Sequence, residues 1–495
     1  CFWNNRRLEE RMIKNFILKG IFKDSVVLMS ASQKVKEKLK LEEVSAMMGT
    51  DVNKKLLSSV GLLTDEGKKA GNDDIIVAVK GDPSKFEDVL NELKMEFAKR
   101  EEKKEVKEEI DFDSAIENVD IVYISLPGDY VYPYAKKAIL KGKDVMIFSD
   151  NVSIEEEIDL KKLSIKKNVL VMGPDAGTAI YKGAYFGFVN NIRKGKIGIV
   201  AASGTGIQEV SCIIHNLGSG ISHAIGVGSR DIKEKVGGIS MLKGIDFLEN
   251  DKDTEVIIII SKPPDSGVKK KIIERVKKGK KRYVIDFIGE ENLSLKDVAI
   301  KGVELLKRRK VSLKEEKYLN LIGKLRKKVK GGFFRGFYSG GTLANEAVFF
   351  FEKSNIKVYS NVTKKKEFLL PTGFKSKENT VVDMGEDEFT RGKPHPMIDF
   401  SLRKERIVKE AKNKKVKIIF FDIVLGFNAH PDPAEEIKDA VKRIRRKDLV
   451  ILSSITGVKE DPQNLLIQEK KLKELGILTF KTHKSMIDFI IKLIK

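Results

Sequence analysis

The chain has 495 residues, of which 41% are hydrophobic and 34% are charged, and its formal net charge is +22. This length exceeds one ordinary hydrophobic core and predicts roughly three α/β units. The longest aliphatic run, Val256–Ile260, is too short to span a bilayer, so we expect no membrane segment.

The charge and the cysteines limit the expected partners and compartment. Lysines are spread along the chain without interleaved aromatic residues, which favours a solvated basic surface over a nucleic-acid interface. Among the candidate functions, nucleic-acid binding is therefore the least favoured. The positive charge can still help attract anionic substrates such as CoA or phosphates. Cys1 and Cys212 form no disulfide framework and no signal peptide is readable, so we expect a cytoplasmic protein. No Cys/His cluster has metal-ligand spacing, so we expect no metal.

Strand-like runs alternate with helical runs along most of the chain, which predicts an α/β fold of parallel sheets with crossover helices. The expected strands span residues 25–30, 44–48, 75–79, 121–126, 144–148, 169–172, 221–227, 256–260, 283–287, 380–384, 417–422, 449–453 and 477–479. Further segments are helices at 132–141 and 154–166, a mixed-charge helix end or linker at 99–109, and a basic helical connector at 299–330.

A small-residue turn lies between an apolar strand pattern that starts at Lys196 and a helical pattern. Its residues are Ser203, Gly204, Thr205 and Gly206. Such a turn lets backbone N–H groups approach an anion, with help from the helix dipole. We predict that it binds a phosphate or acyl phosphate; the alternative is a plain strand–helix connection.

A second strand-to-turn segment, residues 418–433, is suited to a related role, and we predict that Gly426, Asn428 and Ala429 also bind the phosphate. His430 could donate to an anion or act in acid–base catalysis. Its alternative role is that of a loop-capping histidine. Asp432 could orient His430 or cap the next helix.

Two further segments are candidate sites. Asp387, Glu388, Arg391, His395 and Asp399 form a rich polar cluster, in which Arg391 with Lys393 could clamp a carboxylate or phosphate. We predict catalytic roles for His395 and Arg391, against the alternative of a polar loop wrapping a domain edge. Ser339, Gly340, Gly341 and Thr342 lead from a strand to a helix and form a third candidate anion or substrate site.

Six motifs, in order over nearly the whole chain, strongly resemble the FdrA family, which is similar to succinyl-CoA synthetase. The motifs are Ser149–Val152, Gly173–Thr178, Ala202–Glu209, Gly336–Leu343, Asp387–Asp399 and Gly426–Pro433. The resemblance implies several Rossmann-like and flavodoxin-like parallel-sheet domains. The implied divisions are an N-terminal α/β region at 1–105, a CoA-binding-type domain at 106–190, a ligase domain at 191–310, a basic linker at 311–334 and a C-terminal flavodoxin-like domain at 335–495.

The same resemblance extends to site residues. It implies that Ser149, Asn151, Gly173 and Pro174 bind CoA or substrate. It also implies that the turns at 203–206 and 426–430 correspond to the two helix N-termini that face one phosphorylated group in the synthetases. We therefore predict that these two turns form a paired cradle.

Several departures from the synthetase pattern limit the function that is implied. The segment Asp286–Leu295 has no histidine where the synthetases carry phosphate on one, and their supporting glutamate is also missing near Ser261–Pro264. Neither an ATP-grasp segment nor the opening Gly-rich CoA loop is evident. Ala176 stands where FdrA proteins commonly carry a cysteine, which removes a thiol role.

The resemblance implies an enzyme or enzyme subunit of acyl-phosphate-type group transfer. Two forms stay open: CoA-thioester chemistry, with CoA as cofactor, and carbamoyl transfer between oxamate and carbamoyl phosphate in allantoin degradation. The substrate would be a small anion (an acyl phosphate, carbamoyl phosphate, oxamate or a CoA thioester), handled with partner subunits or as a homo-oligomer. The alternative class is a non-catalytic scaffold or regulatory subunit that binds CoA or phosphate.

Overall fold

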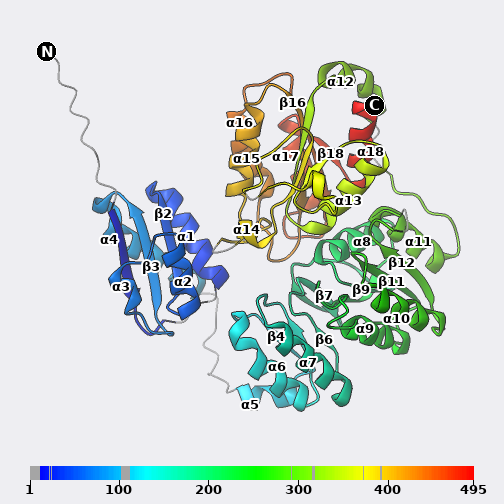
Figure 1. Ribbon diagram of the computed structural model, residues 1–495, viewed down its shortest axis with the longest axis horizontal. Coiled ribbons are helices and arrows are strands. Elements are labelled where there is room, and N and C mark those ends of the chain that lie inside the picture. Colours follow the sequence, from blue (N-terminus) through cyan, green and yellow to red (C-terminus); the bar gives the residue numbers. More distant parts are fainter. Residues whose placement is uncertain are drawn as a thin grey trace. The chain divides into compact units, whose positions relative to one another are not determined.

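The computed structural model describes residues 12–21, 23, 25–101, 112–290, 293–314, 318–371, 373–390 and 393–495 (Figure 1). The chain divides into two compact units, Cys1–Ile110 with Thr390–Pro394, and Asp111–Phe389 with His395–Lys495. None of the helices in the described ranges is both long and apolar enough to cross a membrane.

The first unit contains a three-stranded antiparallel sheet in the order β1-β3-β2. Its elements are β1 (Met12–Leu18), α1 (Ser25–Leu39), β2 (Glu43–Met48), α2 (Asp51–Ser59), α3 (Asp65–Lys68), β3 (Ile75–Gly81) and α4 (Phe86–Glu101). The strand expected at 25–30 is wrong, because these residues begin α1. Leu28, Ala31 and Val35 follow helical spacing and are buried in the core. This helical pattern determines the structure here, rather than the short apolar run at 25–30 from which a strand was expected. Antiparallel pairing also departs from the parallel sheet that we expected. The predicted 99–109 linker lies mostly outside the described residues.

The second unit begins with a small parallel sheet in the order β4-β5-β6. Its elements are α5 (Phe112–Ala115), β4 (Ile121–Ile124), α6 (Val131–Leu140), β5 (Asp144–Ile147), α7 (Ile154–Lys167) and β6 (Val171–Met172). The expected strands and helices of this region are confirmed. The loops that follow the three strands therefore meet at one edge of the sheet.

A six-stranded sheet follows in the order β12-β11-β9-β10-β7-β8. Its strands are β7 (Thr178–Tyr181), β8 (Ala184–Gly187), β9 (Lys194–Ala201), β10 (Ile221–Gly226), β11 (Val256–Ser261) and β12 (Arg282–Phe287). Its helices are α8 (Gly204–Asn216), α9 (Ile239–Asn250), α10 (Ser266–Lys277) and α11 (Leu295–Lys307). Strands β9 to β12 are parallel and β7 joins antiparallel. Every residue of β11 is buried, as expected for a central parallel strand with helices on both faces.

The basic connector expected as helix over 299–330 is only partly helical. Arg308 adopts a left-handed conformation and ends α11, and the next α-helix is α12 (Ile322–Val329).

The C-terminal sheet is entirely parallel, in the order β14-β15-β13-β16-β17-β18. Its strands are β13 (Phe333–Tyr338), β14 (Tyr359–Ser360), β15 (Thr380–Asp383), β16 (Val416–Val424), β17 (Val450–Thr456) and β18 (Leu478–Phe480). Its helices are α13 (Gly341–Lys353), α14 (Asp387–Thr390), α15 (Ser401–Ala411), α16 (Pro433–Arg443), α17 (Leu465–Glu474) and α18 (His483–Ile494). The predicted α/β class is confirmed.

Helices α8 and α13, from different sheets, pack against each other (Figure 1). One hydrophobic core contains Ile207 of α8 and Leu343 of α13. A buried polar network lies beside it: Glu209 of α8 accepts from the His483 backbone N–H at 2.9 Å, and the His483 ring contacts Glu346 of α13. Because this network is buried and fully partnered, it fixes the relative position of the two helices.

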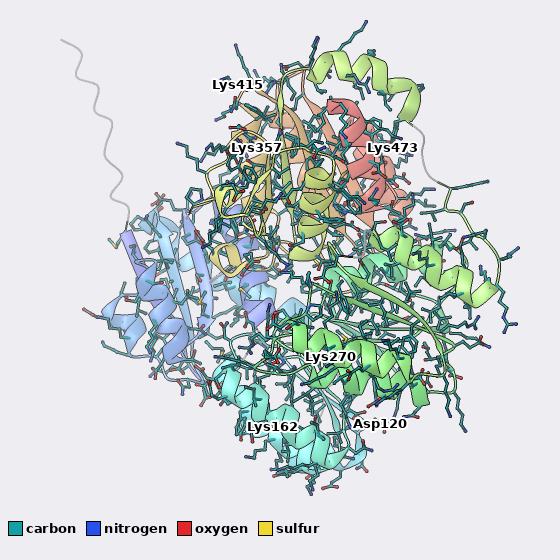
Figure 2. The ribbon with its side chains drawn as sticks, turned by 45° about the vertical axis from the view of Figure 1, so that its right-hand side comes forward. Asp120, Lys162, Lys270, Lys357, Lys415 and Lys473 are labelled. Carbon is teal, nitrogen blue, oxygen red and sulfur yellow. The ribbon has the colours of Figure 1, made fainter. Side chains whose placement is uncertain are left out.

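The basic side chains are distributed over the second unit. Figure 2 shows Lys162 on α7, Lys270 on α10 and Lys473 on α17, all exposed and on separate elements. This arrangement agrees with a solvated basic surface.

Candidate functional site

The N-terminus of α8 is capped by its own turn. The Ser203 hydroxyl accepts a hydrogen bond from the Gly206 N–H at 2.9 Å. A Cβ on Gly206 would lie 2.3 Å from Ser203 Oγ, so glycine is needed for this close cap. The N–H groups of Gly204 and Thr205 have no protein acceptor within the described ranges. They are the donors that a helix N-terminus offers to an anion.

The N-terminus of α13 meets this turn directly. Ser203 Oγ and Thr342 Oγ1 are 2.6 Å apart, and a Cβ on Gly340 would lie 3.0 Å from Thr205 Cγ2. Two positive helix ends therefore converge on one place. We name residues Ser203–Gly206 and Gly340–Thr342 the cradle.

A carboxylate and an ammonium group border the cradle at Gly341. A Cβ on Gly341 would lie 2.8 Å from Asp383 Oδ2 and 3.3 Å from Lys262 Nζ. Asp383 is the last residue of β15 and is 2% exposed, and its Oδ1 accepts from the Gly385 N–H at 2.8 Å. Burial raises the pKa of Asp383 to about 7, opposed by the Gly385 N–H and Lys262 and assisted by Glu386.

Sequence reasoning missed both Lys262 and Asp383 as site residues. Lys262 directly follows β11, and Asp383 ends β15. In parallel α/β sheets, ligands bind beyond the carboxyl ends of strands. The location of Lys262 and Asp383 at strand ends could therefore have identified them as candidate site residues. The sequence alone lacked the sheet order that brings these two strand ends to one place.

Ser339, whose substrate-binding role stays a prediction, is hydrogen-bonded to Asp422 of a buried ion pair. Its N–H donates to Asp422 Oδ1 at 2.9 Å and its hydroxyl donates to Asp422 Oδ2 at 2.5 Å. Arg403 contacts the same Asp422 at 3.2 Å, and all three residues are at most 1% exposed. This arrangement fixes the turn that precedes the cradle.

The turn Gly426–Asn428 packs onto the end of β8. The Gly426 N–H donates to Gln463 Oε1 at 3.0 Å, the Phe427 N–H to Val189 O at 2.8 Å, and Asn428 Nδ2 to Gly187 O at 2.7 Å. We predicted that this turn pairs with Ser203–Gly206. Ser203 Oγ contacts Thr342 Oγ1 and the Gly206 N–H, and the Gly426 and Phe427 N–H groups donate within the protein. The phosphate-binding role of Gly426, Asn428 and Ala429 stays a prediction.

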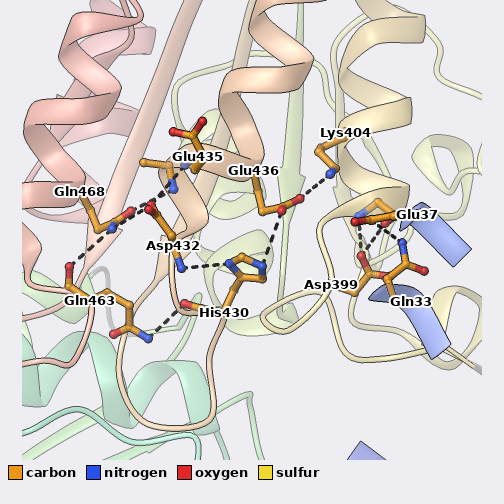
Figure 3. A network of polar contacts seen from close by, with 12 residues as sticks. Gln33, Glu37, Asp399, Lys404, His430, Asp432, Glu435, Glu436, Gln463 and Gln468 are labelled. Carbon is orange, nitrogen blue, oxygen red and sulfur yellow. Dashed lines mark hydrogen bonds and ion pairs between the residues drawn. The ribbon is translucent and has the colours of Figure 1, made fainter. Parts of the chain in front are cut away.

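His430 supports the start of α16 (Figure 3). Its Nδ1 accepts from the Asp432 N–H at 3.1 Å, and its Nε2 lies 3.7 Å from Glu436 Oε1. Asp432 caps α16 by accepting from the Glu435 N–H at 3.3 Å. Burial lowers the pKa of His430, against the attraction of Glu436. This geometry matches the loop-capping alternative; a catalytic role for His430 stays a prediction.

His395 lies against an aromatic ring and is neutral at physiological pH. Its ring centroid is 5.3 Å from that of Phe188, and its Nδ1 accepts from the Met397 N–H at 3.2 Å. Burial, and then the nearby Arg403, lower the pKa of His395 to about 4. Arg391, the third predicted catalytic residue, lies outside the described residues.

The predicted CoA- or substrate-binding residues of the small sheet do come together. Ser149 Oγ accepts from the Leu126 N–H at 3.0 Å after β4, and the Asp175 N–H donates to Ser149 O at 3.0 Å. Asn151 and Gly173, which precedes Pro174, adopt positive φ angles of 55° and 88° in the loops after β5 and β6. These residues form one edge of the β4-β5-β6 sheet, and their binding role stays a prediction.

Three domain families match this chain. They are described as "CoA binding domain" over residues 192–289, "CoA-ligase" over residues 337–488, and "AllF, heavy metal-associated domain" over residues 12–112. The first match contains α8 and the second contains α13, so each contributes one half of the cradle.

The heavy-metal description raises the question of a metal site in the first unit. Residues 12–112 contain neither cysteine nor histidine. Soft metals are held chiefly by thiolate and imidazole ligands, so this segment does not fit such a site. Across the described residues, no group of three or more His, Cys, Asp or Glu side chains is placed to hold a metal ion.

Curated relatives extend the comparison. "Uncharacterized protein YahF" of Escherichia coli K12 is 36% identical over 493 residues, covering 94% of this chain and 95% of its own length. The alpha subunit of succinate–CoA ligase [ADP-forming] from Aquifex aeolicus is 28% identical but covers only 26% of this chain and 44% of its own. The sulfoacetate-CoA ligase subunit SqwL of Acholeplasma sp is 23% identical over 29% of this chain and 49% of its own.

Among solved structures, PH0766 from Pyrococcus horikoshii OT3 aligns with 79% of this chain and 85% of its own at 15% identity and a TM-score of 0.29. The full-length similarity to YahF and the matched domains establish the family. The chain belongs to the succinyl-CoA synthetase-like protein family that contains E. coli YahF.

Proposed function

We propose that this chain is an enzyme subunit of acyl-phosphate-type group transfer, and that the cradle holds the phosphate group of its substrate directly. The observation that carries this proposal is the meeting of α8 and α13, with Ser203 Oγ and Thr342 Oγ1 2.6 Å apart. Two helix N-termini stabilise negative charge that develops on a departing phosphate. Lys262 supplies a full positive charge beside them.

The absence of a phosphohistidine supports a free substrate rather than a phosphorylated side chain. The five histidines are at positions 215, 223, 395, 430 and 483, and none falls in the Asp286–Leu295 segment. His483 is buried between Tyr338, at 2.7 Å, and Glu346, and so is already committed to protein contacts. A phosphate of the substrate would then occupy the cradle itself.

The form of the reaction that we favour is carbamoyl transfer between oxamate and carbamoyl phosphate. This reaction needs a phosphate site, a clamp for a carboxylate and correct positioning, without ATP. The cradle with Lys262 would hold the phosphate. A clamp for the oxamate carboxylate by Arg391 with Lys393 stays a prediction from the sequence. Partner subunits, or further copies of this chain, would complete the site.

CoA-thioester chemistry is the second candidate. It is favoured by the edge of the β4-β5-β6 sheet, where Ser149, Asn151 and Gly173 meet, and by the CoA-type family descriptions. A non-catalytic CoA- or phosphate-binding subunit is the alternative class. Under this alternative the chain would have the same binding sites, and no turnover is expected.

The test combines the full-length chain with the products of neighbouring genes. With oxamate and carbamoyl phosphate, we expect phosphate release that requires this chain. Thr342→Val, which keeps the side-chain shape but removes the hydroxyl, should reduce the rate, whereas Thr363→Val outside the cradle should not. Calorimetric titration with CoA addresses the second candidate. Phosphate binding without turnover in any combination would favour the non-catalytic alternative.

A further inference from the structure

The Asp383 carboxylate faces the cradle from the end of β15. Its Oδ1 accepts from the Gly385 N–H, whereas its Oδ2 is directed to Gly341, the first residue of α13. Within the described residues, Oδ2 has no hydrogen-bond donor. Asp383 as a whole is 2% exposed, so an Oδ2 without a protein donor at the first residue of α13 is available to a ligand at that helix end.

We propose that Asp383 is the proton-transfer residue of the cradle and that Lys262 is the cation that faces the same substrate. This inference rests on the proposed function, because it requires a phosphate-bearing substrate between α8 and α13. Asp383 Oδ2 and Lys262 Nζ both lie within 3.3 Å of one point, the position of a Cβ on Gly341. Both groups therefore border the N-terminus of α13, where a bound ligand would lie beside them.

The backbone around Asp383 holds it rigidly in this position. Its N–H donates to Asn361 Oδ1 at 2.9 Å, and its carbonyl accepts from Asn361 Nδ2 at 2.8 Å. A group fixed on both sides of its backbone can transfer a proton without a large rearrangement.

The role of Asp383 follows from where the proton goes during transfer of the acyl group. When a nitrogen nucleophile attacks the acyl carbon of an acyl phosphate, a C–N bond forms. The C–O bond to phosphate breaks, and the phosphate leaves with the electron pair. The proton lost by the nitrogen passes to Asp383 Oδ2. In the reverse reaction, the Asp383 carboxylic acid returns this proton to the departing nitrogen.

The charged groups around Asp383 suit this exchange at neutral pH. Burial raises the pKa of Asp383 to about 7, with further increases from Glu386 and Asp422, and Lys262 and the Gly385 N–H oppose them. A proton-transfer group works best with a pKa near the working pH.

The test uses sulfate as a probe, because its charge is constant over the relevant range, and calorimetry on the full-length chain. An ionised Asp383 repels the anion, so sulfate affinity should fall about tenfold from pH 5.5 to pH 8.5, with a midpoint near 7. Asp383→Asn should abolish this pH dependence.

Two further variants move the midpoint in opposite directions. Glu386→Gln removes a negative charge and should lower the midpoint, and Lys262→Met removes a positive charge and should raise it while weakening sulfate binding at every pH. Sulfate binding that is independent of pH, or unchanged in its pH dependence by Asp383→Asn, would overturn the role of Asp383 and leave the cradle intact. Failure of the wild type to bind sulfate or phosphate at any pH would instead overturn the proposed function.

Discussion

Ser203 Oγ and Thr342 Oγ1 are 2.6 Å apart although their residues are separated by 139 positions in the chain. Each hydroxyl belongs to the N-terminal turn of a helix that packs on a different six-stranded sheet. Their contact therefore depends on the correct packing of both sheets, and substitutions in either turn report on the same site.

Ser203→Ala should weaken phosphate binding and lower stability together. The substitution removes the cap of α8, which costs about 1 kcal/mol, and removes one hydroxyl from the cradle. Ser153→Ala is the matched control, because Ser153 caps α7 in the same way through the Glu156 N–H. Thermal unfolding and phosphate titration should show a similar stability loss in both variants, with weaker binding only for Ser203→Ala. Equal phosphate affinity in the two variants would show that Ser203 does not bind the phosphate.

Gly341→Ala should block the cradle without a comparable loss of stability. Alanine favours the helix relative to glycine, but its Cβ would lie 2.8 Å from Asp383 Oδ2 and displace that carboxylate. Gly323→Ala in α12 is the control, since a Cβ there meets nothing within 4 Å. We expect both variants to remain folded by circular dichroism and only Gly341→Ala to lose anion binding. Normal binding by Gly341→Ala would contradict the proposed position of the ligand.

Asp383→Asn should stabilise the protein at alkaline pH. The pKa of Asp383 is about 7 in the folded protein against 3.8 as its ordinary value, so the folded state binds the proton more tightly. This contribution to stability is present at acidic pH and is lost as the pH rises through 7. Melting temperatures at pH 5.5 and 8.5 measure the effect. The wild type should lose more stability between them than Asp383→Asn, by at most about 2 kcal/mol, because only the interval from pH 5.5 to about 7 lies below the folded pKa.

His395→Asn should reduce the loss of stability in acid. Burial holds the pKa of His395 at about 4, below the ordinary 6.5, so the unfolded state binds the proton more tightly. Stability from this residue is therefore present above pH 6.5 and is lost as the pH falls toward 4. Asparagine can still accept from the Met397 N–H. Urea unfolding at pH 7 and 4.5 should show a smaller difference for the variant. The same difference in both proteins would mean that His395 is protonated in the folded state.

The sequence predicted the parallel strands well because their apolar runs are nearly continuous. The expected strand 256–260 is β11, and 283–287 lies within β12. Residues 25–30 were mistaken for a strand because a short apolar run has no distinct period until Leu28, Ala31 and Val35 are seen to share one buried face.

The candidate site was predicted in part. Small-residue turns located both halves of the cradle, because close backbone approach requires such residues. The sequence of one turn could not identify Thr342 as the partner of Ser203, because their contact depends on how two sheets pack. Asp383 and Lys262 were missed for the same reason: a strand-end carboxylate becomes unusual only when burial and its neighbours are known.

The two helices of the cradle are covalently joined through residues 308–332. Binding between them is therefore intramolecular, with an effective concentration set by the connector rather than by the amount of protein. Dilution that would separate two independent chains leaves the meeting of α8 and α13 unaffected. The contact between Ser203 and Thr342 should accordingly be the same at nanomolar and micromolar protein.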